Sequence, residues 1–235
     1  MSLELQIARE ARELGVELEE AGARGLARFA ETLASRGRER GVTALEDPEA
    51  VLRELVLDSL AAAPHLPPGG LVADLGSGGG LPGLPLALAR PDLRFLLVES
   101  LGRKVAWLEE QVEDLGLGDR VTVLPVRAED LGREAGRRGC LDGVVAKALA
   151  ALPVLIELAL PLLRRGGRLY AYKGPSAGPE VEASQRALRE LGGSMAAPIP
   201  YRVRDRERLL CVVEKTAATP DRYPRRAGVP ERKPL

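Results

Sequence analysis

The stretch over residues 72–83, VADLGSGGGLPG, constrains the fold more than any other part of the chain. Its apolar start is typical of a buried strand, and Gly76, Gly78 and Gly80 permit backbone angles that other residues avoid. The apolar run 84–89 then continues as a helix. A strand, a glycine turn and a helix in this order direct unpaired N–H groups to the carboxyl edge of a parallel sheet, where nucleotide-like ligands bind. We therefore predict an α/β Rossmann-like fold with a ligand site at this turn.

Two classes of ligand compete for the turn. Gly78, Gly80 and Gly83 satisfy the G-x-G-x-x-G pattern of dinucleotide-binding turns. Asp74, however, stands two residues before the first glycine, where its carboxylate repels a pyrophosphate unless water or a cation intervenes. S-adenosylmethionine carries an ammonium and a sulfonium, so Asp74 suits its methionyl end, directly or through water. We favour S-adenosylmethionine over a dinucleotide and over a purely structural turn, because clustered glycines cost folding entropy.

Composition narrows the class of protein. With 235 residues, 45% of them hydrophobic, the chain can bury a full core. Its net charge is zero, so contact with RNA must use local basic patches. Cys140 and Cys211 lack metal-ligand spacing, which predicts no metal site and two core thiols in a reducing compartment. No signal sequence or membrane span is visible, so we expect a soluble, cytoplasmic monomer.

The pattern divides the chain into three parts. Apolar residues at helical spacing predict an N-terminal helical cap over 1–63. Strands alternating with helices over 64–216 predict a methyltransferase-like domain built on a mostly parallel, seven-stranded sheet. The last strands are expected as an antiparallel hairpin. The segment 217–235 is rich in Pro and Arg and is expected to be an extended basic tail on the surface.

Further candidate ligand residues follow the predicted strands. The second strand, 94–99, ends at Glu99, whose carboxylate can accept both ribose hydroxyls of an adenosine; a helix cap is the alternative. Ser100 follows it and joins the candidate donor contacts. After the third strand, Ala128 and Glu129 are candidates for contact with the adenine ring and its amine.

Two lysines end the fourth and fifth strands. Lys147 and Lys173 are therefore expected at the same carboxyl edge, where they could face one pocket and position a substrate. No general base is assigned. The candidate RNA contacts are Arg103, Lys104, Lys173, Arg225 and Arg226.

Several motifs together resemble one family. They are the runs 57–60, 74–83, 99–104, 173–174 and 223–230. In these runs the chain is similar to the glucose-inhibited division protein B family, bacterial methyltransferases that act on guanine N7 of small-subunit ribosomal RNA. The resemblance implies a class I methyltransferase fold, S-adenosylmethionine as cofactor, and ribosomal RNA or a small-subunit particle as partner. It also implies donor contacts at Gly76, Leu81, Ala128, Glu129 and the position of Lys147.

The chain departs from this family at several positions. The family has an arginine where Lys147 stands, an asparagine near Gly41, a basic–histidine pair at Glu54 and Leu55, and a histidine at Leu209. A lysine lacks the planar fork of arginine, and the other changes remove groups able to face RNA. Donor binding is thus better supported than turnover. A methyltransferase with another acceptor and a non-catalytic, ribosome-associated nucleotide-binding module remain open alternatives.

Overall fold

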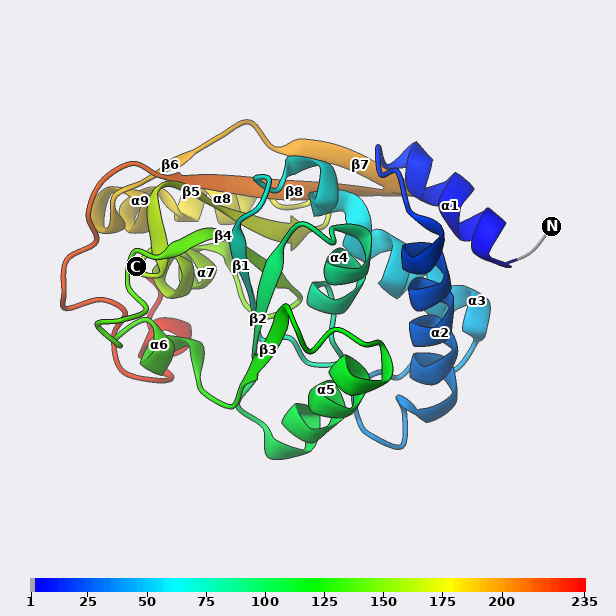
Figure 1. The fold of residues 1–235 in the computed structure, drawn as a ribbon. Helices are drawn as coiled ribbons and strands as arrows, with labels where there is room; N and C mark the ends of the chain where they lie inside the picture. Colours follow the sequence, from blue (N-terminus) through cyan, green and yellow to red (C-terminus); the bar gives the residue numbers. More distant parts are fainter. Residues whose placement is uncertain (1–2) are drawn as a thin grey trace.

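The computed structural model describes residues 3–235, and in this range eight strands form one sheet (Figure 1). The strands are β1 (Leu71–Leu75), β2 (Arg94–Val98), β3 (Val121–Leu124), β4 (Leu141–Lys147), β5 (Leu163–Lys173), β6 (Gly193–Met195), β7 (Ile199–Val203) and β8 (Arg206–Lys215). Their order is β3-β2-β1-β4-β5-β8-β6, with β7 also paired to β8. The first five are parallel, and β8 runs antiparallel to β5. The predicted Rossmann-like fold is confirmed.

The sixth of the seven expected strands, the first of the final hairpin, is divided into β6 and β7, so the predicted count of seven was wrong. β6 pairs with β8 at Met195 and Val213, and β7 pairs with it at Ile199 and Leu210. Pro198 stands between them and has no N–H to donate to a ladder. The two short strands therefore share one neighbour.

Helices cover both faces of the sheet. The side that holds Val72 and Tyr170 packs against the N-terminal helices together with α4 and α5. These are α1 (Leu3–Glu13), α2 (Glu20–Arg36), α3 (Pro48–Ala50), the π-helix η1 (Val51–Leu57), the 3-10 helix η2 (Leu60–His65), α4 (Gly83–Ala89) and α5 (Gly102–Asp114). The expected linker after residue 63 thus begins inside η2. The predicted cap is confirmed as helical and shares its hydrophobic core with the sheet.

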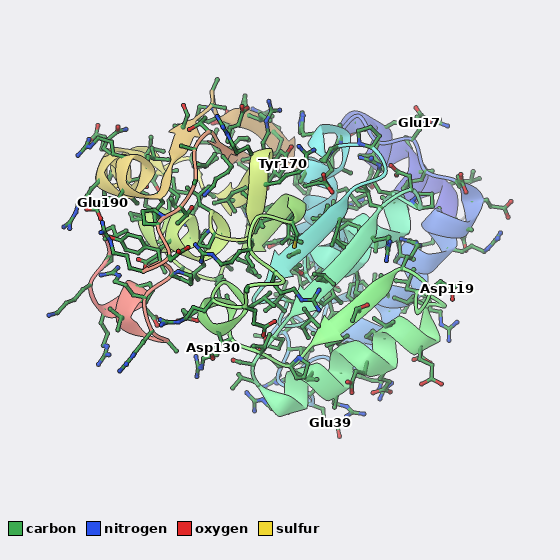
Figure 2. The ribbon with its side chains drawn as sticks, turned by 60° about the vertical axis from the view of Figure 1, so that its left-hand side comes forward. Glu17, Glu39, Asp119, Asp130, Tyr170 and Glu190 are labelled. Atoms are coloured by element: carbon green, nitrogen blue, oxygen red, sulfur yellow. The ribbon has the colours of Figure 1, made fainter. Side chains whose placement is uncertain are left out.

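The opposite face, which holds Ala73 and Leu169, packs against later helices. These are α6 (Ala128–Leu131), α7 (Leu152–Ala159), α8 (Gly178–Ala183) and α9 (Gln185–Leu191). Alternate residues of one strand point to opposite faces, which accounts for the two cores. Figure 2 shows charged side chains such as Glu17 and Asp119 outside, while Tyr170 lies within.

The C-terminal segment is not the extended surface tail that its composition predicts. Tyr223 is 5% exposed and belongs to the core beside α7, and Pro230 is buried in α10 (Val229–Arg232). Cys140 is also exposed, against expectation, whereas Cys211 is buried. Within residues 3–235, no helix is both long and apolar enough to cross a membrane.

Candidate functional site

The glycine turn joins β1 to α4 at the carboxyl edge of the sheet. Gly76, Gly78 and Gly80 have φ angles of 71°, 54° and 96°, in the region that favours glycine. The N–H groups of Gly76 and Ser77 both donate to the carbonyl oxygen of Val98 on β2. The turn is therefore fixed against the neighbouring strand.

Asp74 stabilises this turn through a hydrogen bond from the backbone at the start of α4. Its side chain is fully buried, and Oδ2 accepts the Gly83 N–H at 2.9 Å, at the start of α4. Oδ1 has no hydrogen-bond partner among the described residues. Burial raises the pKa of Asp74 to about 7. Asp74 does not line the cavity at the turn but supports the loop that does; its contact with a ligand, expected directly or through water, stays a prediction.

Glu99 combines the two roles that its position allows. Oε2 accepts the Gly78 N–H at 3.1 Å, and Oε1 accepts the N–H groups of Ser100 and Leu101 at 2.7 and 2.8 Å. It thus fixes the two residues that precede α5 and holds the glycine turn. The same side chain lines the cavity, 7% exposed, with acceptor capacity left on Oε2.

A cavity of about 360 Å³ lies over the turn, at the ends of β1, β2 and β4. The predicted residues that line it are Gly76, Glu99, Ser100, Ala128 and Glu129. Its other walls include the apolar side chains of Val98, Val126, Leu149, Val154 and Leu158. Apolar walls beside two carboxylates suit a ligand with a flat ring, hydroxyl groups and positive charge.

Besides Asp74, three predicted donor residues of the glycine turn do not line this cavity. Gly78 bonds to Glu99 beneath it. A Cβ on Gly80 would lie 2.4 Å from Leu84 Cδ1, so this glycine is required by packing inside the cap. Leu81 is partly buried against the same cap cluster. Gly80 and Leu81 pack against the core on this side of the turn, and their contact with a ligand stays a prediction.

Lys147 points away from the cavity and into the cap. Its Nζ forms an ion pair with Asp58 Oδ2 at 2.5 Å and donates to Leu55 O at 3.1 Å. Burial lowers the pKa of Lys147, and the Asp58 charge opposes this shift. Tyr201 also donates to Asp58 Oδ1, at 3.0 Å. Ala148 and not Lys147 lines the cavity, and the donor contact expected at Lys147 stays a prediction.

Lys173 lies on the opposite face of the sheet. Lys147 pairs in register with Tyr172, so Lys173 is one residue out of phase and points the other way. Its Nζ donates to Ala150 O and forms an ion pair with Glu180 Oε2, both at 2.8 Å. The expectation that the lysines face one pocket was therefore wrong, whereas the RNA contact expected at Lys173 stays a prediction.

Arg225 is likewise held inside the protein. Its guanidinium forms an ion pair at 2.6 Å with Glu157 of α7, whose side chain is 0% exposed. The hydrogen bond to Glu157 raises the pKa of Arg225. Nearby, the Gly228 N–H donates to Glu129 Oε1 at 2.9 Å, so the C-terminal segment adjoins the cavity. Arg225 therefore has an internal partner for its charge, and its role as an RNA contact stays a prediction.

Four cations at this edge are unpaired, and we call them the rim. Arg103, Lys104, Arg127 and Arg226 form no side-chain hydrogen bond or ion pair with another described residue. Lys104 and Arg127 line the cavity, Arg103 precedes Lys104, and Arg226 lies two residues before Gly228. Sequence analysis named three of these residues and missed Arg127.

The departures from the family pattern have local explanations. Glu54 forms an ion pair with Arg206 at 2.9 Å, so its charge is compensated. Gly41 has φ 64°, a conformation that glycine and asparagine share. Leu55 and Leu209 are partly buried against the two cores.

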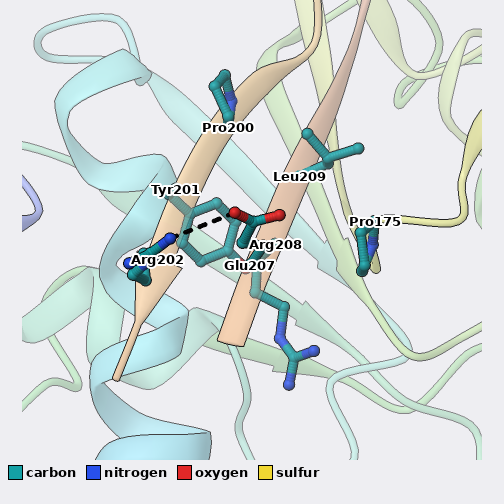
Figure 3. Close-up of a pocket in the computed structure, with 7 residues that line it drawn as sticks. All are labelled: Pro175, Pro200, Tyr201, Arg202, Glu207, Arg208 and Leu209. Atoms are coloured by element: carbon teal, nitrogen blue, oxygen red, sulfur yellow. Dashed lines mark hydrogen bonds and ion pairs between the residues drawn. The ribbon is translucent and has the colours of Figure 1, made fainter. Parts of the chain in front are cut away.

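A second cavity, of about 470 Å³, runs along the β7–β8 hairpin (Figure 3). Pro175, Pro200 and Leu209 line it, and Arg202 and Glu207 at its side are joined by an ion pair at 3.3 Å. It does not include the glycine turn. The smaller cavity is therefore the candidate donor site, and the described residues hold no cluster of metal ligands.

Sequence reasoning missed two other residues. Asp58 falls in the run 57–60, which resembles a family motif, but nothing in the sequence shows that it reaches Lys147. Leu149 lines the cavity with 39% of its surface exposed. A large apolar residue two positions after a strand end was the available signal.

Comparison with known proteins identifies the family. The family model described as rRNA small subunit methyltransferase G matches residues 23–199. The chain is 45% identical over 204 residues to the ribosomal RNA small subunit methyltransferase G of Deinococcus radiodurans, covering 85% of this chain and 80% of that protein. It is 40% identical over 228 residues to the protein of that name from Roseiflexus, covering 96% and 97%.

This chain belongs to the rRNA small subunit methyltransferase G family. Solved structures agree with the fold that this family implies. M. jannaschii TYW2, crystallised with AdoMet, superposes with a TM-score of 0.53 at 13% identity, covering 67% of this chain and 73% of that one. A SAM-dependent O-methyltransferase from Thermotoga maritima gives a TM-score of 0.53 at 17% identity, covering 80% and 72%.

Proposed function

We propose that this member of the methyltransferase G family transfers a methyl group from S-adenosylmethionine to N7 of a guanine in small-subunit ribosomal RNA. The observation that supports it most directly is the cavity over the glycine turn, with Glu99 at its wall and unpaired cations around it. We propose a small-subunit particle or its RNA as the partner.

The cavity fits the donor. Glu99 and Ser100 lie where β2 ends, and Ala128 and Glu129 follow β3, so these residues would hold the ribose and the adenine. The methionyl end would lie beside the glycine turn, where Gly76 lines the cavity. S-adenosylmethionine supplies an electrophilic methyl group, whose bond to sulfur breaks as the bond to guanine N7 forms.

The reaction requires the acceptor to be positioned correctly and needs no general base. Guanine N7 has an in-plane lone pair and carries no proton, so no residue has to remove one. The chain's contribution is to align N7 with the methyl group and exclude water, an effect worth about 7–11 kcal/mol in well-oriented systems. The absence of a histidine from the cavity lining is consistent with this chemistry.

The decisive experiment maps N7-methylguanine in small-subunit particles and in naked 16S RNA, with and without the protein. We expect one new N7-methylguanine that depends on S-adenosylmethionine. Glu99→Gln provides the matched control, because it keeps the shape of the side chain and should weaken donor binding by about 1–2 kcal/mol.

The alternatives give different results. Methylation of another acceptor would indicate a methyltransferase of different specificity. Donor binding without methylation of any RNA would favour a non-catalytic, ribosome-associated module. Calorimetric preference for NAD over S-adenosylmethionine would contradict the donor assignment.

A further inference from the structure

Exposed apolar side chains concentrate at the donor cavity. Three large hydrophobic residues are exposed within residues 3–235: Leu5, Leu101 and Leu149. Leu5 lies on α1, whereas Leu101 and Leu149, 48% and 39% exposed, both line the cavity. Large apolar side chains left exposed in a concave site indicate contact with a ligand.

The backbone turns Leu149 into the cavity. Ala148, directly after β4, has φ 54°, a conformation that residues with a Cβ rarely adopt. Such outliers persist where the surrounding structure holds them, and they cluster at functional sites. At Ala148 the strand ends, and the backbone directs the Lys147 side chain into the cap and the Leu149 side chain into the cavity.

Leu149 rests on the glycine turn. A Cβ placed on Gly76 would lie 2.5 Å from Leu149 Cδ1, which is closer than atoms can approach. Gly76 also has φ 71°. The leucine therefore packs directly over the bare backbone of the turn, where β1 and β4 end.

Two anchors hold this loop in place. Lys173 Nζ donates to Ala150 O at 2.8 Å, and Glu180 Oε2 accepts the Leu152 N–H at 2.7 Å. Lys173 and Glu180 are also paired with each other. Burial raises the pKa of Glu180, but the hydrogen bonds from Lys173 and Leu152 outweigh it and leave the pKa below its usual value. Support of this kind fixes a side chain on which a ligand is to be positioned.

We propose that Leu149 is the side chain against which the target guanine packs during methyl transfer. The proposal rests on the proposed function. If the adenosine end of the donor lies at Glu99, the side of the cavity at the end of β4 is left for the acceptor base. Leu149 lies on that side. An apolar side chain packs against the face of a base, excludes water and leaves the N7 edge free, as in sites that hold extruded bases.

The first test measures methyl transfer in a single turnover at saturating S-adenosylmethionine, with small-subunit particles as acceptor. Leu149→Ala should lower this rate by about 10- to 100-fold, because the base loses its alignment. Because Leu149 also lines the donor cavity, the dissociation constant of S-adenosylmethionine is measured in parallel, so that weaker donor binding is separated from a slower transfer step. Leu149→Met should restore the rate to within about threefold, since it conserves volume. Leu5→Ala is the matched control and should have no effect.

A second readout does not depend on turnover. With methyl-labelled leucines and bound S-adenosylhomocysteine, guanosine monophosphate at millimolar concentration should give a nuclear Overhauser contact between its H8 proton and the Leu149 methyl groups. Leu149→Ala identifies that signal by its loss.

Several results would overturn the proposal. An unchanged rate in Leu149→Ala, or a loss explained entirely by weaker donor binding, would show that Leu149 does not hold the base. Absence of the nuclear Overhauser signal in a protein that methylates guanine would place the base elsewhere. If the signal is present but no guanine becomes methylated, the proposed function fails while Leu149 stands as a base-packing residue.

Discussion

Cations at the carboxyl edge of the sheet fall into two groups that differ in their partners. Lys147, Lys173 and Arg225 each form an ion pair at 2.5–2.8 Å with a carboxylate. The rim cations have no such partner among the described residues. A paired cation supports the fold, whereas an unpaired one at the surface is available to phosphate. Both groups contain lysine and arginine, so residue type does not distinguish them. They differ in whether a carboxylate lies within ion-pair distance.

Replacing a paired cation should have the largest effect. Arg225→Ala leaves the carboxylate of Glu157 buried without its partner, so we expect a loss of about 3–5 kcal/mol in the free energy of unfolding. Arg226→Ala, its neighbour on the rim, should change stability by less than about 0.5 kcal/mol. Chemical denaturation of the two variants measures the contrast.

The double variant Glu157→Leu with Arg225→Leu serves as control. Replacing both partners by apolar residues should recover much of the loss, because no buried charge is left alone. Equal destabilisation by Arg225→Ala and Arg226→Ala would contradict the division into two groups.

Two buried acidic residues show the same contrast between a charge with an ion-pair partner and one without. Glu157 and Asp74 are both 0% exposed, but only Glu157 has a cation in contact. Burial raises the pKa of Asp74 from its usual 3.8 to about 7. Between these values the folded state binds more protons than the unfolded state, so the Asp74 contribution to stability falls as pH rises.

Asp74→Asn tests this directly, because asparagine cannot titrate in this range. Relative to wild type, the variant should gain up to about 4 kcal/mol between pH 4 and pH 7.5. The measurement is the difference in free energy of unfolding as a function of pH. A difference that does not vary with pH would mean that Asp74 has a partner for its charge.

Local patterns in the sequence predicted the fold because each one acts over a few residues. A strand, a glycine turn and a helix follow directly from neighbouring residues, and Glu99 at a strand end predicted a cavity wall. The side-chain partners were not predictable in this way. Arg225 lies 68 residues from Glu157, and Lys147 donates to Ser59, 88 residues away.

Register explains the other failures. Lys147 and Lys173 both end parallel strands, but they stand one residue apart in register and point to opposite faces. The C-terminal segment was mistaken for a solvated tail because Pro and Arg dominate its composition, while Tyr223 packs into the core. Composition describes a segment on average and does not show which single side chain anchors it.

The smallest expected effect concerns RNA affinity. Arg103 and Arg226 lie on the rim and do not line the donor cavity, so Arg103→Gln with Arg226→Gln should weaken RNA binding without altering donor affinity. For each phosphate that is no longer neutralised, the salt dependence should decrease by about 0.7–0.9 units of slope, and affinity should fall about tenfold at moderate salt. The control, Arg204→Gln with Arg206→Gln, removes the same charge from arginines paired with Glu49 and Glu54. Those arginines already have carboxylate partners, so their replacement should leave the salt slope nearly unchanged. If both double variants reduced the salt slope of RNA binding equally, the ion pairs within the protein would not determine which cations contact RNA. In that case the total charge would determine the affinity.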